Sequence, residues 1–96
     1  MIYEKKLSSF SELSRELSIL DLDAGIRTTG KYNGKKCYLF VTRSANGFTS
    51  LLYSMKLLKK ESLPDKRLLA REFEDQGSLE TFLAQIVNKP VKAVSY

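Results

Sequence analysis

The dipeptide Asn33-Gly34 constrains the fold of this chain more than any other feature. Asn-Gly favours a two-residue type I′ turn, because both central positions of that turn need a positive φ. Apolar and polar residues alternate around it, so it predicts a β-hairpin and fixes its register. In that register Lys31 faces Lys36, and Ile26 faces Val41 at the far end.

The side chains of this hairpin divide between two faces, because neighbours along a strand point to opposite sides of the sheet. The expected core face holds Ile26, Thr28, Gly30, Cys37, Leu39 and Val41. The other face is basic and aromatic, and it holds Arg27, Thr29, Lys31, Lys36, Tyr38 and Phe40. We name this second side the open face; it is the first candidate for a binding surface.

A second turn signal, Ala45-Asn46-Gly47, predicts a second hairpin that extends this region to Leu58. A two-residue loop at Asn46-Gly47 would place Leu39 opposite Ser54, which puts a serine into the core. A three-residue loop with Gly47 in the left-handed conformation places Leu39 opposite Tyr53 and keeps the core apolar. We therefore expect the three-residue loop.

The three-residue loop also brings Lys56 opposite Lys36. Lys31, Lys36 and Lys56 would then form a row across three neighbouring strands of the open face. Like charges that face each other destabilise a sheet, so we expect either an acidic side chain or an anionic partner beside them. Glu72, on a later strand, is the acidic residue that this row could meet.

The stretch from Phe48 to Lys60 fits two kinds of element. Its apolar residues also lie on one helical stripe, and the lysines at its end would suit the C-terminus of a helix. The preceding Asn-Gly and the alternation from Thr49 to Leu57 favour a strand, which is the interpretation we adopt. The helical alternative would remove Lys56 from the lysine row.

The N-terminal segment predicts a strand followed by a helix. Ile2 to Leu7 has the composition of a short strand, whose neighbour in the sheet the sequence does not identify. The helix runs from about Phe10 to Leu20 and begins with a capping box made by Ser9 and Glu12. Its apolar stripe is expected to cover the core face of the hairpins.

The C-terminal part predicts a turn, a strand, a helix and an end segment. Glu61 to Asp65 is expected to be a connecting turn because it contains Pro64, and Arg67 to Phe73 is expected to be a strand. Ser78 is expected to cap a last helix with a clear apolar stripe. Val91 to Tyr96 would add a short edge strand or a tail.

Together these elements predict an α+β fold. We expect an antiparallel sheet of four or five strands, a hairpin-rich meander, with two helices packed on one face. The 96 residues are expected to form a single domain, 1–96. The first residues carry charge without an apolar run behind them, and no run approaches membrane-spanning length, so we expect a cytoplasmic protein that does not enter a membrane.

The composition argues against catalysis and against a bound metal. The chain has no histidine, which is the commonest general base and the commonest metal ligand. Its one cysteine, Cys37, falls on the core face, where cysteine acts as a small hydrophobe. Glu72, Glu74 and Asp75 precede the last helix and suit its dipole. We therefore expect no enzyme activity and no cofactor.

The open face is predicted to bind nucleic acid, preferentially single-stranded DNA or RNA. The net charge of +5 favours acidic partners, and Tyr38 and Phe40 could stack on bases. The expected phosphate contacts are Arg27, Lys31, Lys36, Arg43 and Lys56. The order of four strands followed by a helix resembles that of whirly and transcriptional-coactivator type single-strand-binding domains, a resemblance of element order alone.

A protein-interaction module is the alternative function for the same face. Tyr38, Phe40 and Leu52 on an open sheet face would also suit a homodimer or a partner's helix, because aromatic residues anchor protein interfaces. Lysines on an exposed sheet also hinder aggregation without any ligand. The sequence alone leaves the choice between a nucleic acid and a protein partner open.

Overall fold

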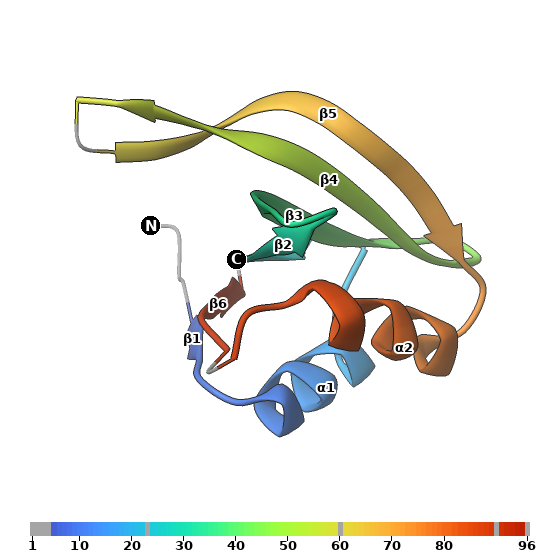
Figure 1. Cartoon of the computed structure of the whole chain (residues 1–96). Coiled ribbons are helices and arrows are strands. Elements are labelled where there is room, and N and C mark those ends of the chain that lie inside the picture. Colours follow the sequence, from blue (N-terminus) through green and yellow to red (C-terminus); the bar gives the residue numbers. More distant parts are fainter. Residues whose placement is uncertain (1–4, 23, 60, 90, 96) are drawn as a thin grey trace.

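The computed structural model describes residues 5–22, 24–59, 61–89 and 91–95. The elements follow the order β1 (Lys5–Leu7), α1 (Phe10–Ser18), β2 (Gly25–Tyr32), β3 (Lys35–Ser44), β4 (Gly47–Leu58), β5 (Glu61–Phe73), α2 (Gln76–Ile86) and β6 (Ala93–Ser95). The strands form one antiparallel sheet in the order β1-β6-β2-β3-β4-β5, and both helices lie on the same side of it (Figure 1). The α+β fold with an antiparallel sheet and two helices is therefore confirmed.

Among the described residues the sheet has six strands instead of the expected four or five. Its last strand, β6, is neither an edge strand nor a tail, because it is inserted between β1 and β2 and is antiparallel to both. β1 begins at Lys5 in the described part of the chain, and residues 2–4 of the expected strand lie outside that part. Segments from the two ends of the chain thus meet in the sheet, and this pairing explains the additional strands.

The β2–β3 hairpin has the register that Asn33-Gly34 predicted. Lys31 pairs with Lys36, and Ile26 pairs with Val41. The turn residues Asn33 and Gly34 have φ values of 52° and 80°, as a type I′ turn requires. All members of the predicted core face are buried, so this part of the sequence interpretation is confirmed.

The second hairpin has a register that neither sequence interpretation predicted. Ser44 pairs with Gly47 around a two-residue loop, Ala45-Asn46, and Leu39 pairs with Leu52. The expected pairing of Leu39 with Tyr53 is therefore wrong by one residue. Along β4 the consequence is that Leu52 turns into the core, while Tyr53 turns to the open face.

Contacts with β5 explain this register. Gly47 has a φ of 150°, and a Cβ at this position would stand 2.0 Å from the carbonyl oxygen of Phe73. Glycine is therefore required here for two reasons: the positive φ, which residues with a side chain rarely adopt, and the close approach of the end of β5. The resulting register places Ser50 opposite Val41. The core thus contains a serine, although the sequence interpretation rejected a register because it would place a serine there.

β4 and β5 form a long hairpin. The strand interpretation of residues 48–60 is confirmed for β4, but the expected turn at residues 61–65 is wrong because β5 already begins at Glu61. The turn falls at Lys59, whose φ is 49°. Pro64 lies within β5, opposite Met55, next to register shifts on either side of Tyr53. Proline is tolerated there because β5 is an edge strand and its pairing is irregular.

Each helix begins at a side-chain N-cap. Ser9 caps α1 as predicted, and its hydroxyl accepts a hydrogen bond from the Glu12 N–H at 3.2 Å. The cap of α2 is Asp75, whose Oδ1 accepts from the Ser78 N–H at 2.7 Å. The prediction that Ser78 caps this helix is therefore wrong by three residues. The helix begins earlier because the Asp75 carboxylate supplies a charged acceptor at its positive end.

The helices cover the core face of the sheet with their apolar sides. The buried helical residues are Leu13, Leu17, Leu79, Leu83 and Ile86. The end of α2 lies close to β2, since Gly30 forms a β-bridge with Val87 and a Cβ on Gly30 would stand 2.2 Å from the Ile86 carbonyl oxygen. Neither described helix is long and apolar enough to cross a membrane.

Candidate nucleic-acid interface

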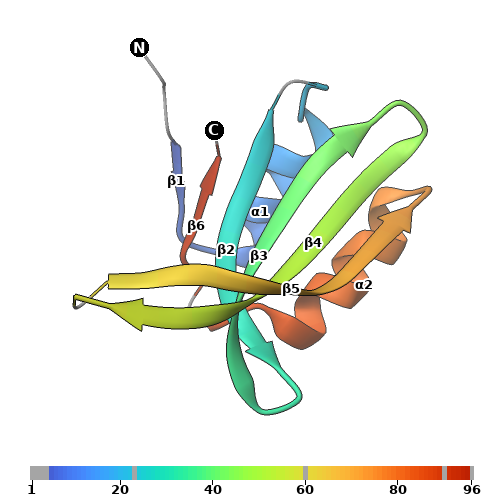
Figure 2. The ribbon, with the colours of Figure 1, turned by 90° about the horizontal axis from the view of Figure 1, so that it is seen from above.

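The open face is the side of the sheet that faces away from the helices (Figures 1 and 2). Cross-strand pairing arranges its side chains in rows. The first row contains Lys6, Val94, Arg27, Phe40, Leu51 and Ala70; the second contains Thr29, Tyr38 and Tyr53; the third contains Lys31 and Lys36. The rings therefore lie in the middle of the face, and the lysine pair lies toward the β2–β3 turn.

Three aromatic rings of the open face touch one another. The Tyr38 and Phe40 rings are stacked with centroids 6.3 Å apart and an interplanar angle of 27°. Phe40 meets Tyr53 edge to face, with centroids 5.5 Å apart and an angle of 87°. All three side chains are half-buried. Such packing holds the rings in fixed orientations while part of each stays open to a ligand.

Lys31 and Lys36 are exposed, and neither has an ion-pair partner among the described residues. Glu72 does not neutralise them, because it pairs with Thr49, which in turn pairs with Thr42. Thr42 and Lys36 are six residues apart on β3, a separation of about 20 Å in an extended strand. The lysine pair is thus a region of uncompensated positive charge.

The structure brings together five of the seven predicted site residues, namely Arg27, Lys31, Lys36, Tyr38 and Phe40. Arg43 belongs to the other face, because it pairs with the buried Phe48 and its Cζ lies 4.7 Å from the centre of that ring. Lys56 is exposed on the outer part of β4, opposite Leu63 of β5. The expected pairing of Lys56 with Lys36 is therefore wrong, and the row contains two lysines instead of three.

Strands β3 and β4 separate at one end of the sheet. Their pairing stops at Cys37 and Ser54, after which Lys36 pairs only with β2 and Met55 only with β5. Residues 55–59 and 61–68, which we call the arm, bend away and pass on the side of β2 and β3 that is opposite the helices (Figures 1 and 2). The register shifts in β5 supply the bend, since an extra residue in one strand increases local twist.

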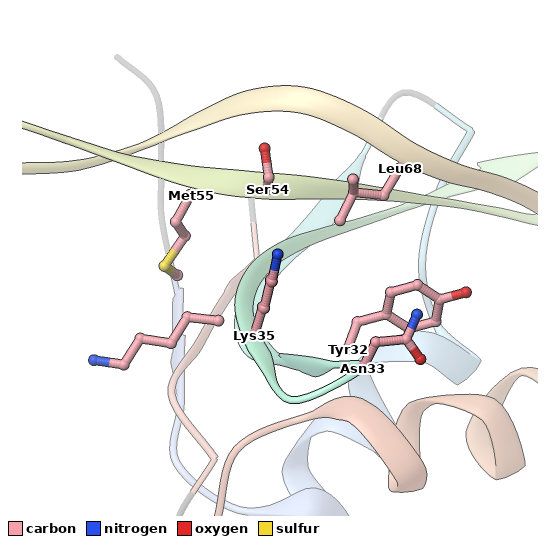
Figure 3. A pocket seen from close by; sticks show the side chains of 7 residues that line it. Tyr32, Asn33, Lys35, Ser54, Met55 and Leu68 are labelled. Atoms are coloured by element: carbon pink, nitrogen blue, oxygen red, sulfur yellow. The ribbon is translucent and has the colours of Figure 1, made fainter.

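A cleft of about 640 Å³ opens between the arm and the tip of the β2–β3 hairpin. Figure 3 shows Met55 and Leu68 pointing from the arm side toward the hairpin, while Lys35 points from the hairpin toward the arm. Tyr32 and Lys36 also line it. The cleft thus combines apolar walls with two lysine side chains, and a volume in this range is typical of sites for small ligands.

The sequence interpretation missed two residues of this surface, Tyr53 and Lys35. The three-residue loop assigns Tyr53 to the core, whereas the observed register pairs it with Tyr38 on the open face. Lys35 was visible as a basic residue next to the Asn-Gly turn. Its place in a cleft depends on the irregular pairing of β5, for which Pro64 was the one sequence signal.

The described surface offers binding chemistry: fixed rings for stacking, ammonium groups for anions and a cleft beside them. The buried Cys37 offers little as a nucleophile, because burial raises the pKa of its thiol above the ordinary value. No group of three or more potential metal ligands occurs among the described residues. Comparison with known proteins finds no match, whether with protein-family models, curated proteins or solved structures.

Proposed function

We propose that the open face binds single-stranded nucleic acid without catalysis. The observation that supports this most directly is the pairing of Lys31 with Lys36 next to the Tyr38, Phe40 and Tyr53 rings. Two lysines without carboxylate partners destabilise an unliganded sheet, and a phosphate backbone would relieve their repulsion. The neighbouring rings would then meet bases.

Stacking and charge have separable roles in this proposal. A base that stacks on an aromatic side chain contributes about 1–3 kcal/mol, largely independent of sequence. Each lysine that contacts a phosphate releases a condensed cation and makes the affinity dependent on salt. A double helix keeps its bases stacked inside, so it can use the lysines but not the rings. We therefore expect a preference for single strands.

Fluorescence anisotropy with labelled single- and double-stranded oligonucleotides at two salt concentrations tests the proposal. We expect salt-sensitive binding that favours the single strand. Lys36→Glu should lower the affinity and reduce the slope of log affinity against log salt by about 1. Arg15→Glu makes the same change of charge on an exposed position of α1, on the other side of the sheet, and should leave both unchanged. Equal effects of the two variants would contradict a site on the open face.

A protein partner is the second candidate, and the arm is the observation that favours it. Leu63 and Leu68 lie on the arm and are 40% and 48% exposed. Exposed leucines on a projecting hairpin suit a protein contact. Light scattering on the same sample decides between the two functions. A dimeric mass together with no oligonucleotide binding at low salt would favour the protein interface.

A further inference from the structure

We propose that a basic groove continues the open face around the tip of the β2–β3 hairpin to the outer side of α2, and that it holds the same single strand of nucleic acid. This inference rests on the proposed function and extends it with a second, separate part of the binding site. The groove consists of three adjoining hollows of about 640, 440 and 320 Å³. The first is the cleft beneath the arm.

Shared residues connect the hollows into one path. The cleft and the second hollow have Tyr32 and Asn33 in common, at the tip of the hairpin. The second and third hollows have Arg71, Phe82 and Gln85 in common, between β5 and α2. The path therefore runs from the arm, past the hairpin tip, and along the exposed side of α2.

The charge of the groove is of one sign. Its lining includes Lys35 and Lys36 in the cleft, Lys31 in the second hollow, and Arg71 in the second and third. No carboxylate lines any of these hollows in the described part of the chain, although the whole protein has 11 aspartates and glutamates. A continuous path in which every charged side chain is positive is complementary to a polyanion.

The guanidinium of Arg71 lies close to two aromatic rings at the far end of the groove. Its Cζ is 5.0 Å from the centre of the Phe73 ring and 5.5 Å from that of Phe82. The two ring centres are themselves 5.2 Å apart. A guanidinium that lies over aromatic rings keeps N–H donors for a phosphate, and it can also stack on a base. This is the combination that a single strand uses and that a simple anion does not need.

The lysine pair joins the groove to the open face. Lys31 and Lys36 belong to the third row of that face, and they also line the second hollow and the cleft, respectively. A strand that leaves the rings of Tyr38 and Phe40 at this end therefore enters the groove without crossing a region of negative charge. The binding site should then be longer than the open face alone.

The length dependence of binding tests the groove in the full-length protein. Labelled oligothymidylates of about 4 to about 20 nucleotides cover the usual range of site sizes for a small single-strand-binding domain. Gln85→Glu adds a negative charge inside the groove with almost no change of shape. Ala84→Glu adds the same charge at the next, exposed position of α2, which does not line the hollows.

We expect Gln85→Glu to weaken binding of the long oligonucleotides by about three- to tenfold, the effect of one repelled phosphate. The shortest oligonucleotides, which the open face accommodates by itself, should bind both variants and the unchanged protein alike. Lys35→Gln should reduce the salt slope for long oligonucleotides by about 1. Ala84→Glu should have no effect at any length.

The other outcomes show whether the groove alone or both proposals fail. If Gln85→Glu and Lys35→Gln bind long oligonucleotides as the unchanged protein does, while Tyr38→Leu weakens binding, the groove is excluded and the open face stands. If the unchanged protein binds no oligonucleotide, both proposals fail. If polyglutamate of equal charge displaces the long oligonucleotide as well as unlabelled oligothymidylate does, the groove recognises negative charge alone and nucleic-acid recognition there is excluded.

Discussion

Lys31 faces Lys36 across the β2–β3 hairpin, and neither lysine has an ion-pair partner among the described residues. Lys36→Glu would replace this repulsion with a cross-strand ion pair. We expect the free energy of unfolding to rise by about 0.2–1 kcal/mol, although the same change weakens nucleic-acid binding. Urea unfolding and anisotropy on one preparation measure the two effects.

The neutral variant Lys36→Gln is the matched control for this prediction. It removes the repulsion without creating the ion pair, so its stability should lie between those of the unchanged protein and Lys36→Glu. A binding defect that accompanies a gain in stability cannot come from misfolding. If Lys36→Glu were less stable than the unchanged protein, the pairing of these two side chains would be wrong.

Ser50 is a second position where a substitution should stabilise the protein. Its side chain is 2% exposed, and its Oγ has no hydrogen-bond partner among the described residues. A buried hydroxyl without a partner carries a desolvation cost, so Ser50→Ala should raise the free energy of unfolding by about 1 kcal/mol. Chemical unfolding monitored by circular dichroism provides the measurement.

Ser54→Ala is the control for Ser50, because it removes the same atom from the same strand. The Ser54 Oγ accepts a hydrogen bond from the Lys66 N–H at 3.1 Å. This variant should therefore lose about 0.5–1.5 kcal/mol. Equal loss of stability in the two alanine variants would show that Ser50 has a hydrogen-bond partner after all.

Gly30 should not tolerate a side chain. An alanine Cβ there would stand 2.2 Å from the Ile86 carbonyl oxygen and 2.8 Å from its carbon, and a backbone carbonyl cannot move aside as a flexible side chain can. Gly30→Ala should destabilise the protein by at least about 2 kcal/mol. Gly34→Ala, in the open turn with nothing within 4 Å of the new Cβ, should cost about 1 kcal/mol through its positive φ. A smaller loss for Gly30→Ala than for Gly34→Ala would contradict the close approach of α2 to β2.

The features that the sequence predicted correctly are those decided by neighbouring residues. Asn33-Gly34 sets the register of its hairpin because a two-residue turn needs a positive φ at both positions, and these two residues adopt it readily. Ser9 begins α1 because its side chain accepts from an N–H three residues along the chain. In the candidate site, the same local register correctly predicted that Lys31, Lys36 and Tyr38 share one face of the sheet.

The predictions that were wrong concern features that depend on residues far away in the sequence. The register of β4 follows from the contact of Gly47 with Phe73, which the turn alone does not indicate. Lys56 does not belong to the lysine row, because β4 turns away from β3 after Ser54. The cleft and the groove depend on that separation and on the packing of Arg71 over the rings near α2. Local patterns contain no information on any of these contacts.

Asp75 should make the stability of α2 depend on pH. The Ser78 N–H and then the Ser78 hydroxyl donate to its carboxylate, and these bonds hold the pKa of Asp75 below its ordinary value of 3.8. A carboxyl whose pKa is lower in the folded state stabilises that state while it is ionised. The stabilisation is therefore complete above the unfolded pKa and is lost as the pH falls through the folded value.

Thermal unfolding of Asp75→Asn beside the unchanged protein isolates this effect, because every other titratable group is common to both. Asparagine can still accept from the Ser78 N–H, but it has no charge at the positive end of α2. The unchanged protein should have the higher Tm at pH 7, and the difference should shrink as the pH falls below 3.8. Asp75→Ala, which removes the cap itself, should stay less stable at both extremes, since a protonated Asp75 keeps a carbonyl acceptor. A difference between the aspartate and asparagine proteins that is the same at pH 7 and at low pH would exclude the ionised carboxylate as the cap.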